Sequence, residues 1–146
     1  MPHKPIEIIL LRQLSTYLVM PIFIVDHLGT LLFYNEAAEG ILGRRFDETG
    51  EVPKEELTKI FLPTDEEGRA LPPDEVPVFK AILTERAVHR KLWVVGASGV
   101  RRGIEATGFP LIGMTRRMLG GVAIFWEIAT PQTQAEASAA DVGALP

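Results

Sequence analysis

The chain has 146 residues, which suits one compact domain and is too short for two domains with cores of their own. Hydrophobic residues make up 47% of it and the formal net charge is −4, so composition predicts a soluble globular protein without a general attraction to nucleic acid. The absence of cysteine excludes disulfides, thiolate metal ligands and cysteine nucleophiles. No apolar run approaches the roughly 20 residues that a membrane span needs, so we expect a cytoplasmic protein without membrane contact.

Hydrophobic spacing and turn residues predict the first elements of the chain. Residues 5–19 carry apolar side chains at steps of three and four, which predicts an amphipathic helix that ends before Pro21. Residues 21–26 and 31–34 are two β-rich runs, and Gly29 between them permits a hairpin turn. The first two strands are therefore expected to be antiparallel neighbours.

A short helix is predicted directly after Asn35. This asparagine precedes strong helix formers with acids in the first turn, and its side-chain oxygen can accept the free N–H groups of that turn as a structural cap. The helix should end at Gly43. Residues 46–77 are acidic and rich in proline and glycine, with one helical pattern at 54–61, and residues 78–86 predict a further helix.

The last part of the chain has strand-like patterns. Residues 88–95, 102–112 and 118–128 are three such runs, separated by the turns Gly96-Ala97-Ser98-Gly99 and Gly113-Met114-Thr115. Three successive strands with short connections predict a meander. Strands, then helices, then strands is an α+β order, so we expect a five-stranded antiparallel sheet.

Two segments of the chain resemble PAS domains. The segment PIFIVDHLGTLLFYNEAAEGILG is similar to the first two strands, the asparagine and the following helix of this family, and DEEGRALPPDEVPVFKAILTERAV resembles its acidic loop and long helix. The resemblance implies the PAS fold, with short helices on one face of the sheet. It divides the chain into an N-terminal amphipathic cap helix (1–20), a PAS domain (21–130) and a disordered tail (131–146).

The resemblance implies a sensory and regulatory module in signal transduction and not an enzyme. It further implies a small apolar ligand, a homodimer, and a signalling partner such as a histidine kinase of a two-component system or a transcription regulator. Two alternatives stay open. One is a ligand-free dimerisation domain, and the other is a small nucleotide-binding enzyme that uses the glycine turn at residues 96–99 after an apolar strand.

The ligand pocket that the resemblance implies lies between the sheet and the long helix. Ordinary core packing is the competing interpretation, because no polar groups that would orient a ligand stand out in the sequence. The pocket candidates are apolar residues of the strands and of the long helix: Leu31, Phe33, Phe79, Ile82, Leu83, Leu92, Val94, Ile104, Ala106, Ala123 and Phe125.

Composition restricts the cofactors that such a pocket accepts. A flavin that forms a cysteine adduct needs a thiol, and haem needs an axial ligand, whereas residues 78–86 hold no histidine. His89 follows that helix and is expected at the surface, like His3 and His27. The acidic clusters lack the spacing of a calcium loop. We therefore expect no cofactor and no metal, with non-covalent flavin or haem as the weaker alternative.

The last strand predicts an interface. Residues 121–128 are mostly apolar in both alternating sets, so both faces of the sheet need cover. The helices between the second and third strands cover one face. The other face is expected to meet the N-terminal helix of the same chain or of a second copy, through Leu10, Leu14, Tyr17, Leu18, Val122, Ile124, Trp126 and Ile128.

Overall fold

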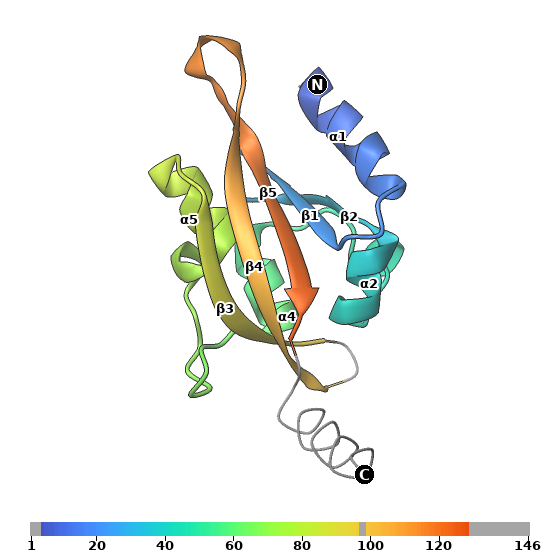
Figure 1. Ribbon diagram of the computed structural model, residues 1–146, viewed down its shortest axis with the longest axis vertical. Helices are drawn as coiled ribbons and strands as arrows, with labels where there is room; N and C mark the ends of the chain where they lie inside the picture. The colour runs from blue at the N-terminus through green and yellow to red at the C-terminus, as the bar shows by residue number, and fades with distance from the viewer. Residues whose placement is uncertain (1–3, 97–98, 129–146) are drawn as a thin grey trace, which may run out of the picture.

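A five-stranded antiparallel sheet in the order β2-β1-β5-β4-β3 forms the centre of the fold in the computed structural model, which describes residues 4–96 and 99–128 (Figure 1). The first strand therefore lies beside the last. The α+β fold with an antiparallel sheet, as the sequence predicts, is confirmed. The strands are β1 (Ile22–Asp26), β2 (Leu31–Tyr34), β3 (Val88–Val95), β4 (Arg101–Ile112) and β5 (Met118–Glu127).

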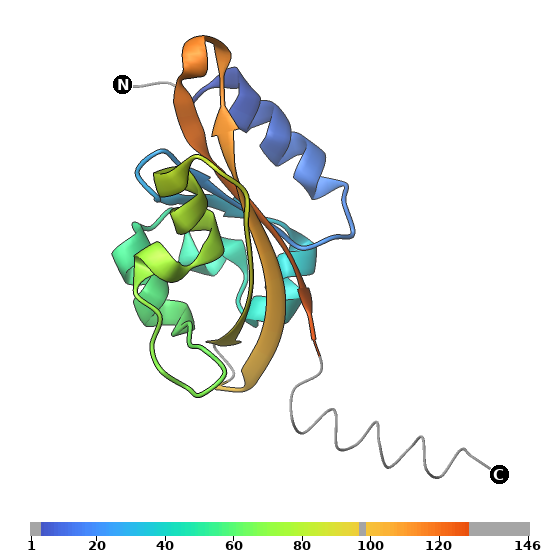
Figure 2. The same cartoon turned by 60° about the vertical axis from the view of Figure 1, so that its left-hand side comes forward.

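Helices lie on both sides of this sheet. Helix α1 (Ile6–Thr16) lies on one side, the outer face, whereas α4 (Lys54–Phe61) and α5 (Pro77–Thr84) lie on the other, the inner face (Figure 2). Helix α2 (Glu36–Leu42) adds its buried side chains to the inner core. No helix of the described residues combines the length and the apolar character of a membrane span.

The helix bounds differ from the predicted ones in the acidic connection, at the first helix and at α5, which ends at Thr84 and not at residue 86 because Glu85 adopts the left-handed conformation. Helix α1 ends at Thr16, short of the predicted residue 19, and the N–H groups of the next two residues bond back to its last turn. The four-residue helix α3 (Phe46–Thr49) was not predicted, because its region has the composition of connecting structure. His3 and the predicted tail, residues 131–146, lie outside the described residues.

Asn35 connects three parts of the fold. Its Oδ1 accepts the N–H of Ala38 at 3.1 Å, which confirms the predicted cap of α2. The same oxygen accepts the N–H of Ile22 at 3.1 Å, and Nδ2 donates to the carbonyl oxygens of Ser15 and Met20, each at 2.9 Å. The side chain is only 1% exposed. It thus joins the end of α1, the start of β1 and the start of α2.

Phe33 lies on the outer face, where strand alternation did not place it. Val25 pairs with Leu31 and Ile24 pairs with Phe33, so Leu32 is an extra residue in a bulge of β2. Leu32 and Phe33 consequently both pack into the outer core, while Leu31 stays in the inner one. The prediction that Phe33 belongs to the inner pocket is therefore wrong.

Helix α1 meets the sheet by a different side from the predicted one. Ile8 is 1% exposed and Ser15 is fully buried, whereas Leu10 and Leu14 are each 56% exposed. Both sides carry residues at helical spacing, so periodicity alone did not separate them. Asn35 Nδ2 donates to the carbonyl of Ser15, and Ile8, two helical turns earlier, lies on the same side of the helix as Ser15.

Within one chain, Trp126 does not meet the leucines of α1, so this half of the prediction is wrong, whereas a contact with a second copy stays a prediction. Val122 is buried in the outer core with Ile8, and Ile124 packs at its edge. Trp126 lies beyond this cover and is 41% exposed. Its indole N–H donates to Oε2 of Glu105 at 3.0 Å, so the exposed ring has a polar partner on the neighbouring strand.

Candidate functional site

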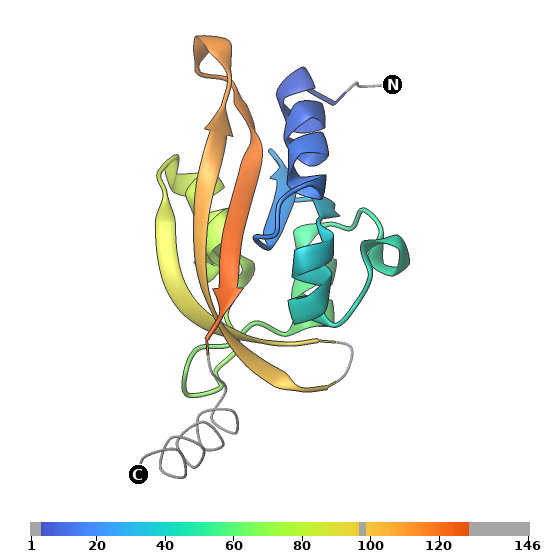
Figure 3. The same ribbon diagram turned by 45° about the vertical axis from the view of Figure 1, so that its right-hand side comes forward.

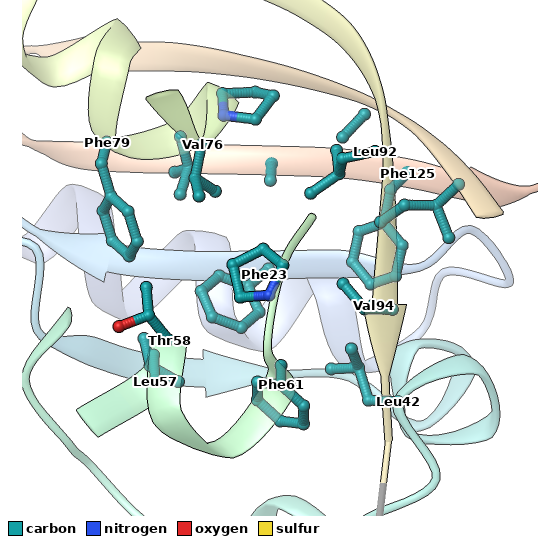
Figure 4. Close-up of a pocket in the computed structure, with 16 residues that line it drawn as sticks. Phe23, Leu42, Leu57, Thr58, Phe61, Val76, Phe79, Leu92, Val94 and Phe125 are labelled. Carbon is teal, nitrogen blue, oxygen red and sulfur yellow. The ribbon is translucent and has the colours of Figure 1, made fainter. Parts of the chain in front are cut away.

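An apolar cavity of about 80 Å³ lies between the inner face of the sheet and helices α4 and α5 (Figure 4). Phe23 of β1 lies in the middle of this view. Phe79 of α5, Phe61 of α4 and Phe125 of β5 surround it, so the walls come from segments far apart in the sequence.

The cavity offers apolar contact and almost no hydrogen bonding. Thr58 is the single lining residue with a polar side chain among those described, and its hydroxyl donates to the carbonyl of Glu55 at 2.9 Å. No charged side chain of the described residues lines the cavity. Because an unpaired polar or charged group is costly to bury, these walls suit a small uncharged apolar molecule.

Most of the predicted pocket residues line this cavity, and others lie elsewhere. Leu31 and Ile82 pack in the inner core without reaching the cavity. Leu83 is 59% exposed, because α5 turns it away from the buried side that carries Phe79. The predicted residues that do line the cavity are Phe79, Leu92, Val94, Ile104, Ala106, Ala123 and Phe125.

Helix α4 supplies walls that sequence reasoning missed. Its residues Leu57 and Phe61, one helical turn apart, are both buried and line the cavity. Their spacing was the available signal, but the helix stands in an acidic stretch that has the composition of a connection. Phe23, Leu42 and Val76 were missed as well.

Glycines of the sheet allow α5 to lie close enough to form one wall. A Cβ at Gly108 of β4 would overlap the backbone of Pro77 and Val78. A Cβ at Gly121 of β5 would lie 3.1 Å from side-chain atoms of Val78 and Ile82. The distance between α5 and the sheet, and hence the size of the cavity, depends on these two positions.

Tyr34 is a titratable group that stands beside the aromatic walls. Its ring lies 5.9 Å from that of Phe23 and 6.3 Å from that of Phe61. Burial raises the pKa of the Tyr34 phenol above its ordinary value, against the opposing effect of the hydrogen bond with Thr49. The hydroxyl donates to the carbonyl of Arg44 at 2.9 Å, so Tyr34 brings no charge to the inner core.

The inner cavity is small for a group of the size of haem or flavin. Sites for ligands of drug size occupy about 300–1,000 Å³, well above the volume of this cavity. No histidine lines it among the described residues. His89 stands on an exposed part of β3, with Nδ1 2.7 Å from Oγ1 of Thr107 and Nε2 3.7 Å from Oε1 of Glu105, and His27 is exposed in the β1–β2 turn.

The acidic clusters form local pairs with arginine. Asp47 lies 3.1 Å from Arg45, and Asp65 lies 3.1 Å from Arg69. The backbone N–H of Arg69 lowers the pKa of Asp65, so this carboxylate stays ionised as part of its loop. Within residues 4–96 and 99–128, no three His, Asp or Glu side chains gather as a metal site requires.

The glycine turn of the enzyme alternative joins two antiparallel strands. The N–H of Gly99 donates to the carbonyl of Gly96 at 2.9 Å, and Val95 pairs with Arg101. A dinucleotide site needs a helix after such a turn, to receive the phosphates at its N-terminus. Ala97 and Ser98 lie outside the described residues, but strand β4 follows the turn, so the helix that such a site requires does not follow it.

Solved structures with this arrangement are PAS domains. The chain matches the PAS domain of Bordetella pertussis BvgS with a TM-score of 0.60 and 17% identity, over 94% of this chain and 97% of that one. It matches the PAS domain of nitrogen regulation protein NR(II) from Vibrio parahaemolyticus with a TM-score of 0.59 and 15% identity, over 82% and 98%. It matches the Rhodobacter sphaeroides LOV protein with a TM-score of 0.67 and 14% identity, over 94% of this chain and 76% of that one.

These likenesses are in structure and not in sequence. No protein-family model matches the chain, and no curated protein matches it. The element order and the strand order of the sheet nevertheless agree with one architecture. The chain therefore has the PAS fold, as its sequence predicts.

Proposed function

We propose that this chain is a sensory module of a signalling protein, which binds a small uncharged apolar molecule in the inner cavity and passes its binding on to a partner. The observation that carries the proposal is a cavity in the middle of the inner core without a charged wall among the described residues. A molecule there touches α4, α5 and the sheet together, so its binding favours one arrangement of these elements. The likeness to a nitrogen regulation protein supports a regulatory role.

We further propose that the module works as a homodimer through the outward side of α1. Leu10, Leu14 and Tyr17 follow one another at helical spacing, and all three are exposed. Leu18 and Trp126 are exposed as well. Contiguous exposed apolar side chains of this kind mark interaction surfaces. A dimerisation domain without a ligand remains the second candidate, because this surface needs no cavity to function.

Benzene is a suitable probe of the inner cavity, because it is small, apolar and uncharged. At ten times its dissociation constant it is expected to stabilise the protein by about 1.4 kcal/mol, or roughly 3–6 °C in Tm. Ala106→Leu places a larger side chain in the cavity and should abolish this shift. Thermal unfolding with and without benzene measures both. An equal Tm with and without saturating benzene in the original protein would favour the ligand-free dimerisation domain.

The purified protein is expected to be colourless. Its absorption should be flat above about 350 nm, since protein aromatic groups absorb below that and colour requires a cofactor. The small cavity and the absence of histidine from its described walls give the physical reason. An absorption spectrum at high protein concentration tests this directly, and a strong band at about 400 or 450 nm would contradict it.

A further inference from the structure

A second cavity lies on the opposite side of the sheet, between α1 and strands β1 and β2. Its volume is about 440 Å³, which falls within the range of small-molecule sites. The floor is apolar: Ile8, Ile24 and Leu32 lie beneath it almost closed to water, and Ile9 of α1 and Phe33 of β2 present its accessible apolar surface. Figure 3 shows α1 alongside the strands at this side. None of the residues that line it lines the inner cavity.

The rim of this outer cavity is cationic and polar. Lys4, Arg12, Gln13 and Thr16 line it, and no acidic residue does so among the described residues. Lys4 is already paired with Glu51, at 2.6 Å. Arg12 is therefore the cationic residue of the lining that stays available to pair with a negatively charged ligand.

Arg12 is held in position and has unused hydrogen-bonding capacity. Its guanidinium carbon lies 4.8 Å from the centre of the Phe33 ring and 5.7 Å from that of Phe46. Within the described residues its side chain makes no hydrogen bond and no salt bridge, whereas Arg69 and Arg102 pair with carboxylates. Contact with a ring uses a face of the guanidinium, so the N–H donors in its plane remain free.

We propose that the outer cavity binds a small amphipathic carboxylate, with the carboxylate on Arg12 and the apolar body against Ile9 and Phe33, the accessible apolar residues of the lining. A guanidinium matches a carboxylate with two parallel hydrogen bonds, which gives both affinity and orientation. The cation above an apolar floor selects an anion with an apolar body over a neutral molecule. The bound molecule would contact α1 and β2 together and so hold the helix against the sheet.

Octanoate and 1-octanol are matched probes, because they share an apolar chain and differ in the charge of the head group. Calorimetric titration of the full chain is expected to show that octanoate binds at least about tenfold more tightly than octanol. Arg12→Gln should lower octanoate affinity by about 10–100-fold and leave octanol affinity unchanged, because it removes the charge and leaves the floor. Arg12→Lys keeps the charge but not the two parallel bonds, so its octanoate affinity should lie between those of the original protein and Arg12→Gln.

Ala106→Leu separates this site from the inner one. It fills the inner cavity only, so it should abolish benzene binding and leave octanoate binding intact. NMR contacts from the octanoate methyl group to Ile9 and Phe33 would place the chain on the accessible apolar lining. The proposal is overturned if Arg12→Gln, shown to be folded by its unfolding midpoint, binds octanoate as the original protein does. Loss of octanoate binding in Ala106→Leu, or no octanoate binding up to about 1 mM, would overturn it equally.

Discussion

Replacing Asn35 by alanine is expected to lower the free energy of unfolding by about 3 kcal/mol, above the roughly 1 kcal/mol of an ordinary helix cap. The side chain satisfies the N–H groups of Ile22 and Ala38 and the carbonyl groups of Ser15 and Met20, in a place almost closed to water. Alanine leaves these buried groups without a partner. Urea unfolding at equilibrium measures the loss.

Asn35→Asp is the matched control, because it keeps the shape and the acceptor and removes the donor. The N–H groups of Ile22 and Ala38 keep a partner, so the cap of α2 should survive. The second oxygen then faces the carbonyl oxygens of Ser15 and Met20 and repels them, so α1 should separate from the sheet. Hydrogen exchange should rise in α1 and not in α2. A loss in Asn35→Ala of 1 kcal/mol or less, about that of a cap alone, would contradict the connecting role.

The hydrogen bonds of Asn35 show what sequence reasoning reaches. The cap on Ala38 is local, three residues away, and a helix-start pattern predicts it. The bonds to Ser15 and Met20 join segments that only the folded chain brings together, so no local pattern contains them. The sequence therefore predicts that Asn35 matters, but it understates the effect of removing it.

The residues that line the inner cavity were predictable on strands whose side chains alternate regularly between the two faces of the sheet. Leu92 and Val94 of β3, and Ile104 and Ala106 of β4, all face inward as their period of two requires. Phe33 breaks the rule because a bulge cannot be recognised in LLFY without the partner strand. The volume of the cavity also depends on packing in three dimensions, which no single segment encodes.

The outer cavity has no comparable signal in the sequence. Arg12 is one basic residue in an amphipathic helix, and its usual interpretation is a solvated surface charge. Its place over two aromatic rings follows from the bulge that turns Phe33 outward and from the side by which α1 meets the sheet. Both of these are tertiary features, so the site emerges only when they are combined.

Two substitutions on α1 are expected to affect different properties, because one apolar side of the helix packs on the sheet and the other is exposed. Ile8 is buried in the outer core, so Ile8→Asp forces a carboxylate against Ile24 and Val122 or detaches the helix. The free energy of unfolding of the monomer should fall by about 3 kcal/mol. Leu14 is more than half exposed, so Leu14→Asp should change the stability of the monomer by less than about 0.5 kcal/mol.

For self-association, Leu14→Asp is expected to have the larger effect. Leu14→Asp places a charge in the middle of the exposed apolar side of α1, between Leu10 and Tyr17, so it should abolish the proposed dimer while the monomer stays folded. Sedimentation velocity over a wide range of concentrations measures this, with urea unfolding of dilute samples as the stability readout. If Leu14→Asp dimerises as strongly as the original protein, or if the original protein is monomeric throughout, the proposed dimer surface is wrong. If Ile8→Asp unfolds at the same urea concentration as the original protein, then α1 does not stabilise the sheet through Ile8, and the floor of the outer cavity loses the helix that bounds it.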